Sequence, residues 1–459
     1  MAGEECRKVS EDVMFSQFLV ECNDNGFQKM KKFVRELGVQ CPISDQNMRS
    51  QPLLSVMRDQ YDYVDNHGYW EHPTFPNTAW KLPSAHQNQS VLAREAELPA
   101  SLMSSRIFNK PMMITEFDYA APNVNRAEGA VVMGSYAALQ DWDALFQFAY
   151  AHNNFNVTDA SRGPSGHFDL STDVVKALSQ KIGLALFLDG GLEPLPELFA
   201  IALTGGEGLD FTRGYSSQVP RLGLVARIGT VILPEGKIDP ARMPENLTAL
   251  LNPGFNFPSE TGNIPVFDAS EGNLTLLQDL QAKGLLPKQS FDAKQRIFRA
   301  NGGRVELNAG EQTFRAVTPR CEALILPAGK SGKGSFLEVS NQVGRAVFSA
   351  ISLDRRPLAE SGRTLLLHLT DTQASKTKYH SAAMTQLDAW GTPPYLAARG
   401  EAEIVLHVAP GGAYRLYALD VSGKRLGETA LRREGDVIRF PARVFTDAGA
   451  VLAYELVRE

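Results

Sequence analysis

The first half of the chain alternates short apolar runs with segments of helical periodicity. Apolar residues recur every three or four positions over residues 10–37, which predicts a helix that ends at Gly38. Strand-like runs at 39–44, 61–66, 110–116 and 143–150 predict strands, the first weakened by Pro42. Helical segments near 53–58, 91–105, 125–140 and 172–188 follow these runs, the second interrupted at Pro99. Asn125 and Glu128 form a capping-box pattern at the start of the third.

This β-α alternation predicts a parallel sheet with crossover helices. About four such units occupy residues 1–200, whereas a complete (β/α)8 barrel needs about 250 residues. The pattern therefore favours about half a barrel with long loops. Glycine and proline punctuate residues 201–300, which we interpret as a linker or barrel extension with a helix near 274–284.

From residue 303 the hydrophobic period changes to two, and turn signals such as Gly411-Gly412 separate the runs. Alternation of this kind predicts short antiparallel strands. We expect residues 301–459 to form a β-sandwich region without a catalytic role, either one unit or two small sandwiches meeting near residue 390. The expected fold class is therefore α/β followed by all-β.

Composition narrows the classes of function. The chain has 459 residues, 43% of them hydrophobic and 21% charged, as in ordinary globular proteins. Its net charge of −6 argues against a nucleic-acid partner, and no apolar run approaches the ~20 residues of a membrane helix. The dispersed cysteines predict no zinc site, with Cys22 and Cys41 as buried free thiols. We expect no metal and no cofactor.

The run Lys110-Pro-Met-Met-Ile-Thr-Glu116 carries the first candidate chemistry, because it ends on a carboxylate. Catalytic groups of α/β barrels stand at the carboxyl ends of their strands. Retaining glycosidases use two carboxyl groups about 5 Å apart, one of them a nucleophile. Glu116 fits that nucleophile. The alternative is a structural ion pair with a neighbour such as Arg126.

Other polar and aromatic side chains follow predicted strand ends. His67 and Tyr69 lie just past the strand at 61–66 and could hold Glu116 or bind sugar hydroxyls. Trp70 and Trp80 suit stacking on sugar faces, although both could belong to the core. The remaining candidate substrate-binding residues follow later strands: Asp118, Gln147 and Tyr150.

Three segments together resemble a known family. Asp62-Tyr-Val-Asp-Asn-His-Gly-Tyr69, Ile114-Thr-Glu116-Phe and Asp143-Ala-Leu-Phe-Gln-Phe-Ala-Tyr150 are similar to strands six, seven and eight of the clan-A glycoside hydrolases, which include the cellulase-like family 5 enzymes. The resemblance covers the first two-fifths of the chain. It implies a retaining β-glycosidase with Glu116 as nucleophile, a glycan as substrate, and accessory β-sandwiches after the barrel.

One part of the family's pattern is missing. The clan places its acid/base glutamate after strand four, usually behind an asparagine, and no Asn-Glu pair occurs in this chain. The alternatives are a non-catalytic carbohydrate-binding protein and a β-sandwich protein with a degenerate barrel remnant. An open half-barrel exposes a sheet edge, so we expect self-association or a missing N-terminal half-barrel as partner. No signal peptide is recognisable in residues 1–7, although similar full-length enzymes are often secreted or periplasmic.

Overall fold

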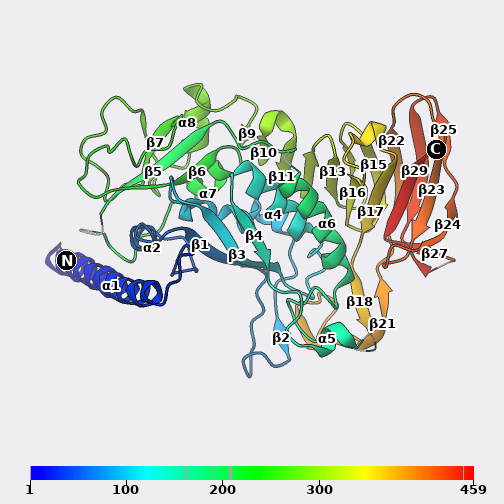
Figure 1. Cartoon of the computed structure of the whole chain (residues 1–459), viewed down its shortest axis with the longest axis horizontal. Coiled ribbons are helices and arrows are strands. Elements are labelled where there is room, and N and C mark those ends of the chain that lie inside the picture. The colour runs from blue at the N-terminus through cyan, green and yellow to red at the C-terminus, as the bar shows by residue number, and fades with distance from the viewer. Residues whose placement is uncertain (1, 160, 162, 190, 206–208, 448) are drawn as a thin grey trace.

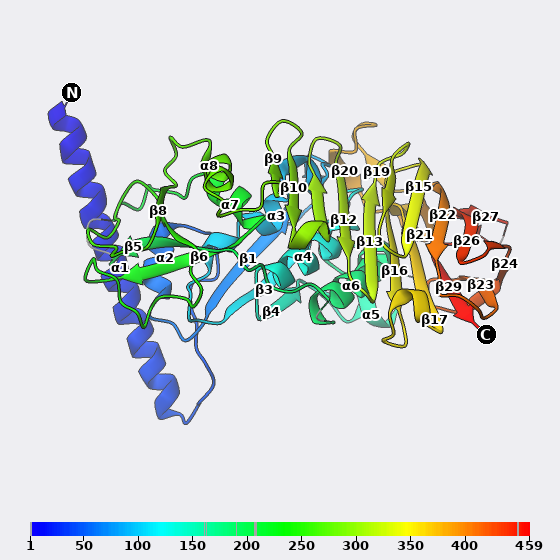
Figure 2. The same ribbon diagram turned by 90° about the horizontal axis from the view of Figure 1, so that it is seen from above.

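The structure is a computed structural model that describes residues 2–159, 161, 163–189, 191–205, 209–447 and 449–459. Parallel sheets with their helices occupy one end of an elongated molecule, and large antiparallel sheets occupy the other (Figure 1; Figure 2). The prediction of an α/β part followed by an all-β part is confirmed at this level.

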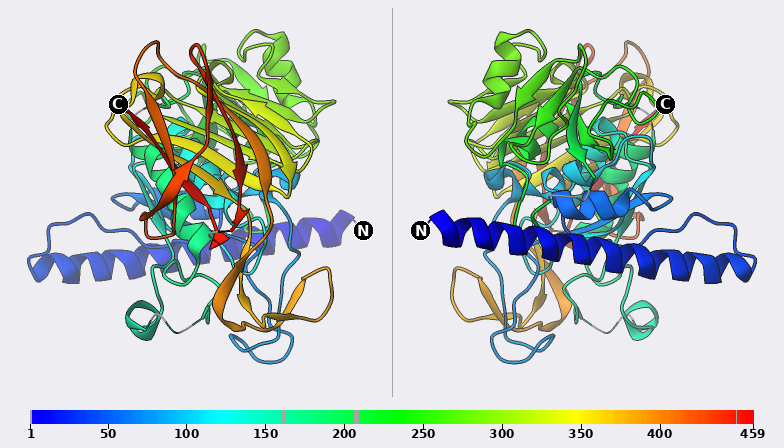
Figure 3. Two further views of the ribbon diagram at one scale, coloured as in Figure 1. Left: turned by 90° about the vertical axis from the view of Figure 1, so that its right-hand side faces the viewer. Right: turned by 90° about the vertical axis from the view of Figure 1, so that its left-hand side faces the viewer.

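Helix α1 (Ala2–Glu36) lies across one end of the molecule (Figure 3). Its inner face is held by Phe27, whose ring lies 4.5 Å from that of Tyr61. Gly38 ends the helical segment with a φ of +87°, a value that favours glycine. The predicted strand at 39–44 is wrong: the segment is irregular, in keeping with the inability of Pro42 to donate to a ladder.

The free thiols are not distributed as expected. Cys22 and Cys41 are both exposed, while Cys321 is buried. The prediction of burial for the first two is wrong for separate reasons. Cys22 faces away from the packed side of α1, and Cys41 lies in the irregular segment that replaces the predicted strand.

A first parallel sheet has the order β1-β3-β4, from β1 (Val64–Trp70), β3 (Met112–Tyr119) and β4 (Ala144–Gln147). The strands are displaced from the predicted runs. Strand β1 continues to Trp70 because its polar residues pair with β3, His67 opposite Glu116 and Tyr69 opposite Asp118. His67 and Tyr69 therefore stand within β1, not beyond its end as predicted, and β3 continues three residues past Glu116, its predicted last residue.

Helices pack against one face of this sheet. α2 (Pro52–Arg58) is confirmed. The helix predicted over 91–105 with an interruption at Pro99 is broken further, into short turns that include α3 (Glu97–Ala100). α4 (Glu128–Leu139) begins without a side-chain cap. The predicted capping box is wrong because the Glu128 carboxylate instead accepts hydrogen bonds from Ser90 and Arg345.

α6 (Val174–Leu188) crosses α4 closely. A Cβ on Gly134 would stand 2.6 Å from the carbonyl oxygen of Gly183, so the crossing requires glycine. Asp173 caps α6 by accepting from the backbone N–H of Lys176. Both helices are also covered by the antiparallel sheet, where the rings of Tyr136 and Phe314 lie 6.1 Å apart.

A second parallel sheet occupies part of the region interpreted as a linker. Its order is β6-β5-β7-β8, from β5 (Leu198–Thr204), β6 (Arg227–Leu233), β7 (Ala249–Asn252) and β8 (Val266–Asp268). The helix expected near 274–284 is present as α8 (Leu276–Ala282), and α7 (Gln218–Gly223) precedes β6. Ile107 bridges in parallel to Thr230 of β6, which joins this sheet to the segment before β3.

The expected antiparallel strands form two large sheets. The ten-stranded sheet runs, in spatial order, through β24 (Arg425–Thr429), β23 (Tyr414–Leu419), β29 (Ala453–Arg458), β17 (Arg363–Leu369), β16 (Ala346–Ser352), β13 (Cys321–Leu326), β12 (Thr313–Val317), β11 (Val305–Asn308), β10 (Ile297–Ala300) and β9 (Phe291–Asp292). The five-stranded sheet runs through β14 (Ser331–Lys333), β15 (Leu337–Val343), β22 (Glu401–His407), β26 (Val437–Arg443) and β25 (Arg432–Glu434).

These two sheets share a buried apolar cluster that includes Phe348, Leu366, Val339 and Phe440. The other face of the ten-stranded sheet covers α4 and α6. Strand β22 pairs with β15, and β29 with β17. Hydrogen bonding therefore runs across residue 390, where the sequence had suggested a boundary between two small sandwiches.

An excursion leaves the antiparallel sheets between β17 and β22. It contains β18 (Thr372–Ser375), β19 (Lys378–Tyr379), β20 (Gln386–Ala389) and β21 (Thr392–Ala397). β20 pairs with β2 (Ser84–Ala85), which belongs to the loop after β1. In Figure 1 this excursion lies below the sheet of β1, β3 and β4, near β2 and α5 (Phe155–Thr158).

Candidate functional site

Glu116 is held by two side chains of the neighbouring strand. The Tyr69 hydroxyl donates to Oε2 of Glu116, and Nδ1 of His67 lies 3.2 Å from the same oxygen. Parallel pairing produces this arrangement, because it sets His67 directly opposite Glu116. The Glu116 side chain is 31% exposed. The carboxylate is thus oriented by the protein and open to solvent at once.

The His67 ring is fixed from its other side. Its Nε2 lies 2.9 Å from the Thr115 hydroxyl oxygen, and that hydroxyl donates to the Asp65 carboxylate at 2.7 Å. Thr115 has one hydroxyl hydrogen, so a donor to Asp65 must accept from His67. The ring is thus held from both sides, by Glu116 at Nδ1 and by Thr115 at Nε2.

Tyr69 keeps its proton. Burial raises the pKa of its phenol far above the ordinary value, and the adjacent Glu116 carboxylate raises it further. A phenol that cannot ionise remains a hydrogen-bond donor across the accessible pH range. Tyr69 can therefore hold one oxygen of Glu116 while the other oxygen stays free to react.

Asp118 and Gln147 lie close by but are turned away from solvent. Asp118 is fully buried, 2.7 Å from Lys176 Nζ, and accepts from Gln147 at 2.6 Å. Burial raises the pKa of Asp118, against the opposing effect of Lys176. This position does not support the predicted contact of Asp118 with a sugar. Asp118 instead has a structural role, because its contacts with Gln147 and Lys176 join β3 to β4 and to α6.

The alternative partner for Glu116 is engaged elsewhere. Arg126 is buried and binds Asp173 and Asp371, each at 2.5 Å. The structural ion pair between Glu116 and Arg126 is therefore not formed. The fixed orientation of Glu116 comes from Tyr69 and His67 instead.

A cluster of aromatic rings adjoins Tyr69. The Phe168 ring lies 5.1 Å from that of Tyr69 and 6.1 Å from that of Trp80. Trp80 is 63% exposed, whereas Trp70 is buried and donates its indole N–H to the Gln89 carbonyl. Tyr150 is exposed in the loop after β4. Trp80, although it contacts His72, Phe75 and Phe168, and Tyr150 are thus largely exposed to solvent, whereas Trp70 belongs to the core.

Two cavities flank the site on the side of β1. One of about 550 Å³ and one of about 430 Å³ share Tyr69, Trp70, His72 and Glu97 in their walls. Volumes of this size suit small-molecule ligands. Sequence reasoning missed Glu97, since it stands in a broken helical segment and forms an ordinary ion pair with Arg94. Only the fold places it near His67.

The excursion from the antiparallel sheets also reaches this region. The Trp390 ring lies 4.7 Å from that of His167, next to Phe168 in the aromatic cluster. The Asn88 side chain donates to the Ala383 carbonyl. The surroundings of the site therefore include residues after 303, a region for which the sequence predicted no catalytic role.

Within the part of the chain that the structure describes, no group of three or more His, Cys, Asp or Glu side chains is placed to hold a metal. None of the described helices combines the length and apolarity needed to cross a membrane. Comparisons with models of known families, with curated proteins and with solved structures found no match for this chain. The chemistry of the site must therefore be argued from its geometry.

Proposed function

We propose that this chain carries the nucleophile side of a retaining β-glycosidase site, with Glu116 as the nucleophile. The observation that supports it most is the pair of contacts from Tyr69 and His67 to Glu116 Oε2. They orient the carboxylate for attack on an anomeric carbon, which gives a covalent glycosyl-enzyme that water then hydrolyses. On this proposal β1, β3 and β4 are the last three strands of a (β/α)8-type barrel.

The second carboxyl group of the mechanism has to come from elsewhere. Among the described residues bonded to Glu116, the donors are a phenol and an imidazole. Strand β4 is an edge of its sheet, with Phe146 exposed, and α6 exposes Leu184 and Leu188. A second copy of the chain or a complementary half-barrel would cover these groups and would bring a proton donor to the site.

A leaving group that needs no protonation tests the nucleophile by itself. Aryl β-glycosides with a 2,4-dinitrophenyl group should release about one dinitrophenolate per chain in a burst, because glycosylation requires only Glu116. Turnover should then be slow, since no acid/base activates water. A panel of glucosides, galactosides and mannosides covers the undetermined sugar, and intact-mass measurement detects the attached glycosyl group.

Glu116→Gln should abolish both the burst and the mass increase. Glu97→Gln is the control, because Glu97 lines the two cavities beside Tyr69 but forms its ion pair with Arg94. A burst that survives Glu116→Gln would refute the assignment of the nucleophile.

A carbohydrate-binding protein without catalysis is the second candidate. The exposed rings of Trp80 and Tyr150 favour it, since aromatic faces bind glycans whether or not a proton donor is present. Saturable glycan binding without a burst would support this candidate. If the chain shows neither glycan binding nor a burst, the remaining alternative is a β-sandwich protein with a degenerate, inactive barrel remnant.

A further inference from the structure

In the second parallel sheet, the direction in which successive strands are added changes between β5 and β7. From β5 the chain passes to β6 on one side, and β7 then lies on the other side of β5, followed by β8. The loops that leave the carboxyl ends of β5 and β7 therefore run in opposite directions. In open α/β sheets this geometry opens a crevice that binds ligands.

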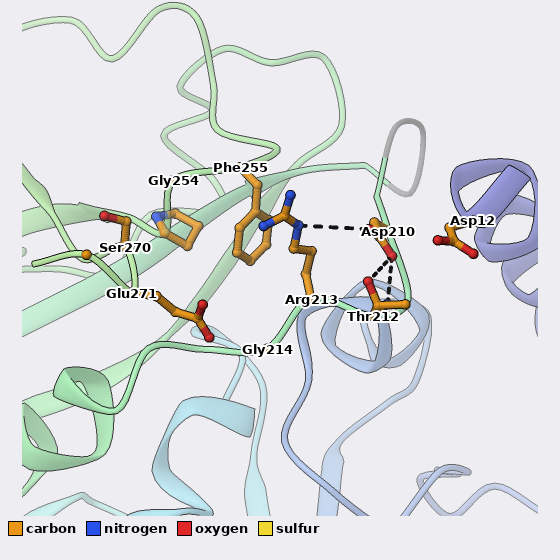
Figure 4. Close-up of a pocket in the computed structure, with 11 residues that line it drawn as sticks. Asp12, Asp210, Thr212, Arg213, Gly214, Gly254, Phe255, Ser270 and Glu271 are labelled. Atoms are coloured by element: carbon orange, nitrogen blue, oxygen red, sulfur yellow. Dashed lines mark hydrogen bonds and ion pairs between the residues drawn. The ribbon is translucent and has the colours of Figure 1, made fainter. Parts of the chain in front are cut away.

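A cavity of about 470 Å³ lies at this point. Its walls come from the loops after β5, β7 and β8, and Asp12 of α1 borders it (Figure 4). The volume falls within the roughly 300–1,000 Å³ of small-molecule sites. It is separate from the cavities at Tyr69, whose lining residues it does not share.

The positive charge of Arg213, the one arginine among the cavity-lining residues that the structure describes, is offset by a neighbouring carboxylate. The Arg213 Nε lies 3.8 Å from Asp210 Oδ2, and the guanidinium stands 6.0 Å from the centre of the Phe255 ring. Asp210 in turn accepts from the backbone and hydroxyl of Thr212. Arg213 thus contributes little net positive charge to a ligand.

Two further carboxylates have no such balance. Among the described residues, neither Asp12 nor Glu271 has a side-chain ion pair or hydrogen bond. Figure 4 shows the Glu271 carboxylate turned toward Phe255 and Arg213, with Asp12 on the far side of Asp210. Unpaired carboxylates repel phosphates and other anions and attract cations.

We propose that this cavity binds a small aliphatic amine. Its ammonium group bonds to Glu271, its methylenes lie against Phe255, and a second ammonium group of a di- or polyamine reaches toward Asp12. The hydroxyl of Ser270 in the same wall adds a neutral acceptor. This proposal is independent of the site at Glu116.

Titration calorimetry of the full chain with spermidine tests the proposal. We expect saturable 1:1 binding that Glu271→Gln weakens about tenfold or more, the effect of losing one charge-assisted hydrogen bond, and that Asp12→Asn also weakens. Glu245→Gln is the control, because Glu245 is exposed and precedes the amino-terminal end of β7, whereas the cavity lies beyond the carboxyl ends of the strands. This substitution changes the net charge equally. It should shift the affinity less than twofold, and circular dichroism checks that each variant is folded.

Three results would overturn the assignment. They are no heat with spermidine at millimolar concentration, equal weakening by Glu245→Gln and Glu271→Gln, and saturable binding of glucose or inorganic phosphate in place of the amine. Loss of spermidine binding on Glu116→Gln would show instead that the amine occupies the other site, and would also refute the proposal.

Discussion

Replacement of Arg126 by methionine should be among the most destabilising single changes in this chain. The guanidinium binds Asp173 at 2.5 Å, Asp371 at 2.5 Å and the Thr372 carbonyl at 2.7 Å. These partners belong to the cap of α6 and to the start of β18. One side chain therefore joins the parallel sheet's helices to the excursion from the antiparallel sheets.

The magnitude follows from burial. Methionine fills a similar volume but leaves two buried carboxylates without a cation, and breaking a buried ion pair in this way costs about 3–5 kcal/mol. In the native protein the arginine helps to hold the pKa of Asp173 below its ordinary value. Burial already raises the pKa of Asp371 despite Arg126. Without the arginine, burial would raise the pKa of Asp371 further and would raise that of Asp173 as well. Stability of the variant is then lost as pH rises through those raised values, so its deficit should shrink between pH 7 and pH 5.

Urea unfolding followed by tryptophan fluorescence at both pH values measures this difference. Hydrogen exchange of residues 371–379 reports whether the excursion opens first. Arg439→Met, an exposed arginine on β26, should change stability by less than about 0.5 kcal/mol. A loss below about 1 kcal/mol for Arg126→Met, or a deficit that grows toward pH 5, would refute the reasoning.

Two further predictions concern single side chains. Tyr69→Phe removes a hydrogen bond to a carboxylate, worth about 1.5–3 kcal/mol, and should slow the dinitrophenolate burst by roughly ten- to a hundredfold; an unchanged burst rate would show that Tyr69 does not position Glu116. His368 is buried against Phe348, and burial lowers its pKa from 6.5 to about 4. The unfolded chain then binds more protons between these values, so stability should fall as pH drops from 6.5 to 4, by up to about 3 kcal/mol from this group. His368→Phe should flatten the slope of unfolding free energy against pH in that interval, and an unaltered slope would contradict the assignment.

The sequence predicts some elements well and others poorly, for physical reasons. The apolar run ending at Glu116 does form a parallel strand, since burial on both faces demands continuous apolar residues. The same signal exists in Leu198–Thr204 and Arg227–Leu233, but the surrounding glycines and prolines suggested a linker. Polar residues of β1 were assigned to a loop because strand propensity does not foresee that partners on β3 will satisfy them.

The candidate site likewise contains residues whose positions the sequence predicts and residues whose positions it does not. Glu116, His67, Tyr69 and Gln147 were expected to converge. The structure brings the first three together, whereas Gln147 donates to the buried Asp118. The burial of Trp70 and Asp118 could not be predicted, since each depends on long-range partners such as Gln89 and Lys176. The capping-box pattern failed likewise, because Arg345 offers Glu128 a stronger, charged partner than a backbone N–H.

The pairing of β2 with β20 has a consequence for biosynthesis. The hydrogen bond between Asn88 and Ala383 spans 295 residues. At a synthesis rate of about 5–20 residues per second, the loop that carries Trp80 would wait roughly 15 to 60 seconds for its partner strand to emerge from the ribosome. Through that interval the apolar rings beside Tyr69 would be available to chaperones, and a chain released early would retain Glu116 but lack the strand that orders its surroundings.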